Sequence, residues 1–229
     1  MKKNNSIFSV FFAILSAFST LFFGASGCGD SHLDLTDYFY PRRIIDKPYE
    51  YRAVGDSIAP YFLKVDYKDN FWDIQRLDVA GQVEFALRDS VVNGGIICSN
   101  YTLFQYDNSG KKTATRPMIN KGANTVFPFA VQKNGGAFPC DIQWKNPSDS
   151  AETIRVTRNR HFEGMINYAW RGRRVECAEF VVKTQYRSDV KGEGTIAPES
   201  VGVERYAKGV GLVYTSSMIG GRMVEYVLQ

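Results

Sequence analysis

Residues 165–187 read MINYAWRGRRVECAEFVVKTQYR, and this stretch decides the fold class. On both sides of Arg171-Gly172-Arg173, apolar and polar residues alternate, which is typical of strands with one buried and one solvated face. The two-residue period of a strand places Ala178, Phe180, Val182 and Tyr186 on one face. We therefore expect residues 165–170 to pair with residues 174–187 as an antiparallel hairpin.

The same alternation recurs along the chain, with turn residues between the alternating segments. It is found at residues 49–52, 82–87, 101–106, 201–206, 210–214 and 223–228. Consecutive strands joined by short turns form an antiparallel meander. The sequence therefore predicts an all-β protein, built either as a curved antiparallel sheet that forms an incomplete barrel or as a two-sheet sandwich.

The beginning of the chain has a different composition. Lys2 and Lys3 precede an apolar run over residues 7–23, and Ala25-Ser26-Gly27-Cys28 follows. A positive segment, an apolar segment and small residues before a cleavage position are the parts of a secretory signal peptide. An uncleaved anchor is the alternative, although residues 7–23 would extend only about 25 Å as a helix against a hydrocarbon core of about 30 Å. Both alternatives export the chain after Cys28.

This pattern resembles that of bacterial lipoprotein precursors, which are cleaved before the cysteine. The resemblance implies an N-terminal signal helix within the signal peptide of residues 1–27, a diacylglycerol and an acyl chain on Cys28, and a lipidated tether over residues 28–37. This covalent lipid is the only cofactor that we expect. Gly29 follows the cysteine where Asp would resemble an inner-membrane retention signal, so the outer membrane of the cell envelope is the expected location.

Residues 38–229 are the predicted single antiparallel β domain. Without residues 1–27 the chain has about 200 residues, the length of one ordinary domain. The loss of Lys2 and Lys3 lowers the formal charge from +4 to +2, and no basic face is concentrated enough to predict nucleic acid as a partner. Three cysteines remain besides Cys28. Either two of them are bridged, in one of three possible pairs, or all three are buried thiols that pack as small apolar side chains. They are Cys98, Cys140 and Cys177.

Two segments resemble a group of uncharacterised envelope lipoproteins from Gram-negative bacteria. They are Asp37-Tyr38-Phe39-Tyr40-Pro41 with Tyr49-Glu50-Tyr51, and Tyr206-Ala207-Lys208-Gly209-Val210-Gly211-Leu212-Val213. The resemblance implies an architecture similar to that of outer-membrane lipoprotein carriers, in which a concave sheet takes acyl chains. Gly209 and Gly211 remove side chains from one face and predict a bend of the sheet, either around a ligand cavity or simply to curl it.

Candidate sites are few. Six arginines could bind phosphate or carboxylate groups if neighbouring strands bring them to one end of the sheet, and otherwise they protect strand ends. They are Arg155, Arg158, Arg160, Arg171, Arg173 and Arg174. His161 is the one credible histidine for a catalytic triad, and we expect it to be structural or solvated. Asp66, Asp69, Asn70 and Asp73 lack the spacing of a calcium loop and predict a solvated turn, so no metal is expected.

Three functions are compatible with these observations. The first is a non-enzymatic, membrane-anchored binding or accessory subunit, which requires a hydrophobic cavity or an exposed aromatic patch. The second is a carrier of a lipid or acyl chain in a concave sheet. The third is a hydrolase that uses unidentified carboxylates or His161, and no residue is assigned as catalytic. The expected partners are the membrane, through the lipid anchor, and an envelope protein or a lipid ligand.

Overall fold

The computed structural model describes residues 32–55, 58–107, 109–133, 135–219 and 221–229. The predicted signal helix and Cys28 lie outside these residues. Residues 32–229 form one compact unit, in which every described element is a strand. The strands are β1 (His32–Asp34), β2 (Tyr49–Ala53), β3 (Tyr61–Lys68), β4 (Phe71–Leu77), β5 (Val83–Val92), β6 (Gly95–Tyr106), β7 (Lys112–Thr115), β8 (Met118–Pro128), β9 (Ala130–Gln132), β10 (Ala137–Lys145), β11 (Glu152–Trp170), β12 (Arg173–Val190), β13 (Gly194–Ile196), β14 (Glu199–Ala207), β15 (Gly211–Ile219) and β16 (Arg222–Leu228).

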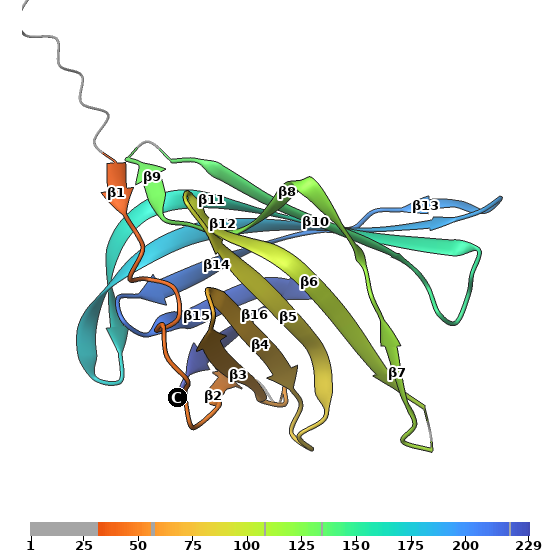
Figure 1. Ribbon diagram of the computed structural model, residues 1–229, viewed down its shortest axis with the longest axis horizontal. Coiled ribbons are helices and arrows are strands. Elements are labelled where there is room, and N and C mark those ends of the chain that lie inside the picture. Colours follow the sequence, from red (N-terminus) through yellow and green to blue (C-terminus); the bar gives the residue numbers. More distant parts are fainter. Residues whose placement is uncertain (1–31, 56–57, 108, 134, 220) are drawn as a thin grey trace, which may run out of the picture. The chain divides into compact units, whose positions relative to one another are not determined.

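Twelve of these strands form a closed antiparallel barrel (Figure 1). Their order around the barrel is β2-β3-β4-β5-β6-β8-β10-β11-β12-β14-β15-β16, and β16 pairs with β2. Each strand thus pairs with the barrel strand that follows it in sequence, as a meander requires. The short strands β7 and β13 extend the edges of β6 and β12, and β1 pairs separately with β9.

The all-β class and the antiparallel meander are confirmed, whereas the incomplete barrel and the two-sheet sandwich are wrong. The barrel closes because the last strand returns to the first, with Leu228 opposite Tyr51 and Tyr226 opposite Ala53. The predicted hairpin is confirmed as β11 and β12, which pair from Glu152 to Trp170 with one bulge. Arg171 and Gly172 form its turn with positive φ angles, as a tight hairpin turn favours.

The segment that follows β1 belongs to the hydrophobic core. Leu35 is fully buried, and the ring of Phe39 lies 5.1 Å from that of Trp72 and 5.3 Å from that of Phe127. β1 and Leu35 fall within residues 28–37, which the sequence analysis assigns to the tether, so part of the predicted tether belongs to the folded domain. Apolar Leu33 and Leu35 alternate with Asp34 in this range, and the alternation was too short to be recognised as a strand.

A buried hydrogen bond stabilises the closure of the barrel. The hydroxyl of Tyr51 on β2 donates to the carbonyl oxygen of Leu212 on β15 at 2.7 Å. Replacing Tyr51 by phenylalanine removes this bond within the core and is expected to lower the free energy of unfolding by about 1 to 2 kcal/mol in urea denaturation. The exposed Tyr186→Phe variant is the control, with an expected change below about 0.5 kcal/mol. Equal effects of the two variants would contradict this account of the closure.

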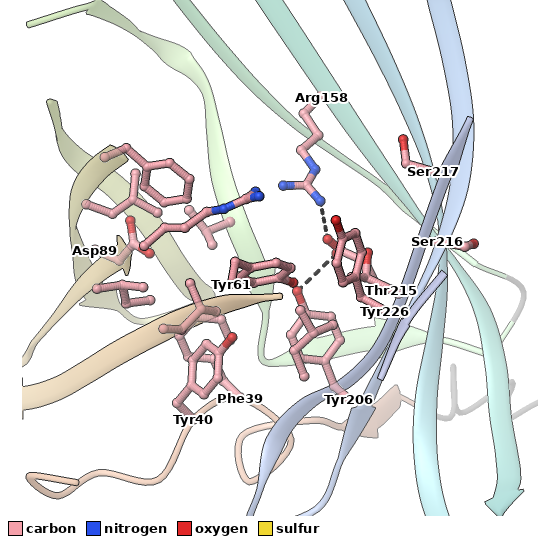
Figure 2. Close-up of a pocket in the computed structure, with 18 of the residues that line it drawn as sticks. Phe39, Tyr40, Tyr61, Asp89, Arg158, Tyr206, Thr215, Ser216, Ser217 and Tyr226 are labelled. Atoms are coloured by element: carbon pink, nitrogen blue, oxygen red, sulfur yellow. Dashed lines mark hydrogen bonds and ion pairs between the residues drawn. The ribbon is translucent and has the colours of Figure 1, made fainter. Parts of the chain in front are cut away.

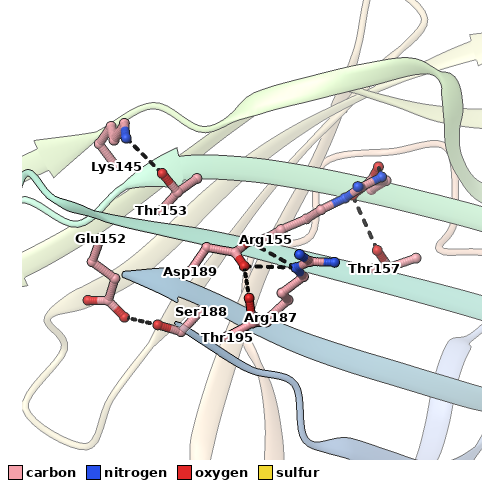
Figure 3. A network of polar contacts seen from close by, with 10 residues as sticks. Lys145, Glu152, Thr153, Arg155, Thr157, Arg187, Ser188, Asp189 and Thr195 are labelled. Atoms are coloured by element: carbon pink, nitrogen blue, oxygen red, sulfur yellow. Dashed lines mark hydrogen bonds and ion pairs between the residues drawn. The ribbon is translucent and has the colours of Figure 1, made fainter. Parts of the chain in front are cut away.

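The long strands β11 and β12 project beyond the barrel together with β13 (Figure 1). Polar side chains hold this projection together (Figure 3). The hydroxyl of Ser188 donates to Glu152, and Arg187 Nε donates to Asp189 at 2.9 Å. Thr195 on β13 donates to the same aspartate. The projecting end is therefore a polar, solvated structure, unlike the interior of the barrel.

Candidate functional site

Two neighbouring cavities lie inside the barrel. The larger has a volume of about 350 Å³ and the smaller about 140 Å³. Leu87, Asp89, Val126 and Arg158 line both of them. Small-molecule sites in proteins have volumes of roughly 300 to 1,000 Å³, so the larger cavity falls at the lower end of this range.

The wall of the larger cavity is partly apolar and partly polar (Figure 2). Most of its apolar side chains come from one side of the barrel, from β3, β4, β5, β15 and β16: Leu63, Ile74, Phe85, Leu87, Leu212 and Val224. Phe39 and Tyr40, from the segment after β1, also line it. Both are buried in the aromatic core, whereas Phe85 and Tyr226 are partly exposed. An apolar wall with a few convergent polar groups is the usual composition of a ligand site.

Glu204 on β14 is a buried carboxylate with three partners. Arg158 and Arg160 on β11 both pair with it, the latter through Nε at 2.8 Å, and the Tyr206 hydroxyl donates to it at 3.0 Å. Burial alone raises the pKa of Glu204, but the two guanidinium groups and the hydrogen bonds more than offset this and lower it to about 2. Glu204 is therefore an ionised, fully satisfied group that fixes the two arginines.

Asp89 on β5 is a buried carboxyl that lines the smaller cavity together with the Cys98 and Cys140 thiols. Its side chain is 1% exposed, and neither of its oxygens has a hydrogen-bond partner among the described residues. Burial raises its pKa to about 8, with a smaller contribution from Cys140. At neutral pH it is therefore a carboxylic acid that can donate a hydrogen bond into the cavities it lines. Buried polar groups without partners are rare in folded proteins, which makes Asp89 the most informative residue of the site.

The raised pKa of Asp89 predicts a pH-dependent stability. An unfolded aspartate loses its proton near pH 3.8, whereas buried Asp89 keeps it to about pH 8. Unfolding therefore releases a proton between these pH values, and the free energy of unfolding falls as the pH rises, by at most about 1.4 kcal/mol per pH unit. The Asp89→Asn variant cannot titrate and is expected to lack this slope.

Urea denaturation at several pH values between 5 and 8 tests this prediction, because only the difference between the two proteins is attributed to Asp89. The variant should become more stable than the wild type as the pH rises. Parallel pH profiles of the two proteins would show that Asp89 titrates normally and would contradict the prediction.

The smaller cavity contains two cysteine side chains, Cys98 on β6 and Cys140 on β10. Contact between the two thiols raises the pKa of Cys98 and lowers that of Cys140 to about 7, and Arg160 contributes to the lowering. Cys177 on β12 is buried elsewhere in the core. All three cysteines are unbridged. Of the three cysteine pairs that the sequence allows, the pair of Cys98 and Cys140 is the one whose side chains line the same cavity.

The six candidate arginines do not gather at one end of the sheet. Arg155 lies near the start of β11 and Arg171 directly follows its end, which is roughly 50 Å farther along the strand at about 3.3 Å per residue. Arg158 and Arg160 point into the barrel, Arg155 pairs with Asp141, and Arg171 and Arg173 lie over the Trp170 ring. Arg174 is exposed near the same turn. The condition for a common cluster is therefore not met, because the arginines are spread along one long antiparallel hairpin and on both of its faces.

The other candidate site residues of the sequence analysis are not among those that line the two cavities. Gly209 lies in the turn between β14 and β15, where its amide donates to the Asp37 carbonyl oxygen at 2.7 Å. Gly211 begins β15 with a φ of 100°, and a Cβ there would lie 2.5 Å from the Tyr40 ring. The glycine thus makes room for the segment after β1. His161 is exposed on β11, opposite Ala137.

The acidic segment considered for calcium is a hairpin turn. Asp69 and Asn70 connect β3 and β4 with positive φ angles, and Asp73 pairs with Arg88 at 2.7 Å. Within the described part of the chain, no group of three or more His, Cys, Asp or Glu side chains is arranged to hold a metal ion. Among the same residues, no helix is long and apolar enough to cross a membrane.

Sequence reasoning missed the two acidic residues of the interior, although a signal for both was present. Asp89 falls on the same face of its strand as Phe85 and Leu87, and Glu204 on the same face as Tyr206. A charged residue at a position that the period assigns to the buried face marks an interior polar site. Tyr101 on β6 also lines the smaller cavity and was noted only as part of a strand.

Comparison with known proteins leaves the chain without an assigned family. No protein-family model matches it, and no curated protein matches it. A solved structure of a candidate lipoprotein from Parabacteroides distasonis is 16% identical, with a TM-score of 0.48 over 86% of this chain and 98% of the other.

Two further solved structures have lower TM-scores. The hypothetical lipoprotein YmcC from Escherichia coli is 15% identical, with a TM-score of 0.36 over 100% of this chain and 98% of the other. A candidate exported protein with a YmcC-like fold from Bacteroides fragilis is 13% identical, with a TM-score of 0.37 over 83% of this chain and 96% of the other. At TM-scores below 0.5, none of these likenesses carries an inference about this chain.

Proposed function

We propose that this protein is a lipoprotein of the bacterial cell envelope that binds a ligand, without transforming it, inside its barrel. The signal pattern that ends at Cys28 supports the lipid anchor, and it also supports a location of the barrel outside the cytoplasm. Two or three acyl chains suffice for stable attachment to a membrane, so the barrel itself is free to serve as a binding module. The outer membrane is the proposed location, because Gly29 follows the cysteine.

The observation that carries the binding function is the interior cavity with Asp89 in its wall. A barrel evolved only for stability would fill its interior with side chains, because empty space forfeits packing interactions. This barrel instead keeps about 350 Å³ open beside a carboxyl that has no partner among the described residues. A ligand in the cavity would restore both the packing and the missing hydrogen bonds.

Native mass spectrometry of residues 29–229, secreted with an ordinary signal peptide, tests this function. This fragment contains the compact unit of residues 32–229 with all described strands and the core. We expect a bound mass of several hundred daltons that organic extraction removes. Val126→Trp, which fills the space between the two cavities, should abolish the bound mass, whereas Val201→Trp on an exposed position should retain it.

Two outcomes would contradict the binding function. The first is a wild-type protein that is bare after mild purification and whose melting temperature no small molecule raises. The second is a bound mass that survives in folded Val126→Trp, because the ligand would then lie outside the barrel.

The lipid anchor is tested separately. In a Gram-negative host, the wild-type chain should incorporate a labelled fatty acid and sediment with the outer membrane. Cys28→Ser should lose the label, whereas Cys177→Ser, at a buried position in the core, should retain it. Labelling that persists in Cys28→Ser would refute lipidation at this residue.

Carriage of an acyl chain is the second candidate function, and the apolar wall formed by Leu63, Ile74 and Val224 favours it. A carrier must release its ligand to an acceptor, whereas a static binding subunit need not. Transfer of a fluorescent fatty acid from the loaded barrel to vesicles, faster than its spontaneous release, would support this function. Release that is independent of vesicle concentration would argue against it.

A further inference from the structure

Three side chains in the wall of the larger cavity have buried polar atoms that form no hydrogen bond with the described residues: Asp89, Arg158 and Arg76, although the Nε of Arg76 lies 2.7 Å from Glu84. Both oxygens of Asp89 are unpartnered among the described residues, and so is the buried Nε of Arg158. The other end of the Arg158 guanidinium pairs with Glu204. Asp89 and Arg158 enter the same space from different strands, β5 and β11 (Figure 2). A ligand head group between these strands could accept one hydrogen bond from the protonated carboxyl and another from the guanidinium.

The charges around the cavities favour a negative ligand. Arg158 and Arg160 face a single carboxylate, Glu204, so this group of three carries one net positive charge. Arg76, at the edge of the larger cavity, is already paired with Glu84 at 2.7 Å. Asp89 adds no negative charge while it is protonated. The Arg160 side chain is 7% exposed and that of Arg158 is 40% exposed, so solvent screens this positive charge only in part, and an anion bound there would compensate it.

We propose that the ligand is an amphiphile with one anionic head group, a carboxylate or a phosphate, which binds between Asp89 and Arg158 while its apolar chain lies against Leu63, Ile74 and Val224. This inference rests on the proposed binding function and specifies its ligand class. A fatty acid and a short lysophospholipid-like phosphate share this chemistry.

Binding of such an anion should weaken when Asp89 ionises. The titratable or charged groups that line the cavities with Asp89 include Arg76 on β4, Cys98 and Tyr101 on β6, Cys140 on β10, Arg158 and Arg160 on β11, and Glu204 and Tyr206 on β14. Asp73 on β4 also acts on Asp89 through its charge. Ionised Asp89 would repel the anion and could no longer donate a hydrogen bond. Cys140 also titrates near neutral pH, so its contribution has to be separated from that of Asp89.

Isothermal titration calorimetry of residues 29–229 with three probes of equal chain length tests the inference. The probes are decanoate, decanol and decyltrimethylammonium. At pH 7 we expect decanoate to bind at least tenfold more tightly than decanol, and the cation to bind most weakly. Decyl phosphate, titrated in parallel, distinguishes a phosphate head group from a carboxylate.

The pH dependence supplies the second readout. From pH 7 to pH 9.5 the affinity for decanoate should fall about tenfold in the wild type and in Cys140→Ser, and should stay constant in Asp89→Asn. Equal binding of the three probes, preference for the cation, or an unchanged pH dependence in Asp89→Asn would overturn the inference while leaving the binding function intact. Failure of every probe to bind would overturn both.

Discussion

Replacing Glu204 by glutamine is expected to lower the free energy of unfolding by about 3 to 5 kcal/mol, because it leaves Arg158 and Arg160 without their counter-ion inside the barrel. Glutamine keeps the shape of glutamate and one acceptor oxygen, so the loss reports the missing charge rather than a cavity. Urea denaturation at pH 7 measures the change.

The comparison with an exposed ion pair makes this prediction specific. The Glu84→Gln variant removes the partner of Arg76, but the Glu84 side chain is 47% exposed, so the expected loss is below about 1 kcal/mol. If the two variants lost equal stability, the interior charge cluster would not be the stabilising unit described above.

The pH dependence of the wild type supplies a second check on Glu204. Its pKa is lowered to about 2 in the folded protein from an ordinary value of 4.5. The folded state therefore binds fewer protons than the unfolded state between these values, and its stability is lost as the pH falls from about 4.5 toward 2. The Glu204→Gln variant should lack this contribution to acid denaturation.

Replacing Phe39 by alanine is expected to cost about 3 to 5 kcal/mol of unfolding free energy. Phe39 is 3% exposed and contacts the rings of Tyr40, Trp72 and Phe127. It precedes the first barrel strand, so a large loss would show that the segment after β1 is an integral part of the core.

The control for Phe39 is Phe104→Ala on β6, whose ring is only partly buried and lies beside Lys112. The Phe104→Ala substitution is expected to lower the free energy of unfolding by about 1 kcal/mol. A small loss for Phe39→Ala in thermal or urea denaturation would mean that the segment detaches without affecting the barrel. The part of the larger cavity's wall that Phe39 and Tyr40 form would then be absent in solution.

The strands of this protein could be predicted from the sequence, but the closure of the sheet into a barrel could not. Alternation within 165–187 identifies the β11–β12 hairpin, because both strands and their turn are contiguous in the chain. The pairing of β2 with β16 joins residues 51–53 to residues 226–228. No local pattern encodes a contact at that sequence separation, so a curved open sheet and a closed barrel look the same in the sequence.

The candidate site could also be predicted only in part, because the role of each residue depends on contacts between strands that are distant in the sequence. Arginines are conspicuous in the sequence, but what each one does depends on which face of the strand it occupies and on what lies opposite. Arg158 and Arg160 share the inward face of β11, and Glu204 reaches them from β14, on the far side of β12. The two-residue period of a strand was sufficient to place Asp89 on the buried face of β5, together with Phe85 and Leu87. Its lack of partners depends on the surrounding strands and could not be predicted.

The measurement that tests the account most directly is a crystal structure of residues 29–229 grown with decanoate. The account predicts electron density for the fatty acid inside the barrel, with the carboxylate within hydrogen-bonding distance of Asp89 and Arg158 and the chain against Leu63 and Val224. An interior filled by protein side chains, or decanoate bound only on the outer surface of the barrel, would contradict it.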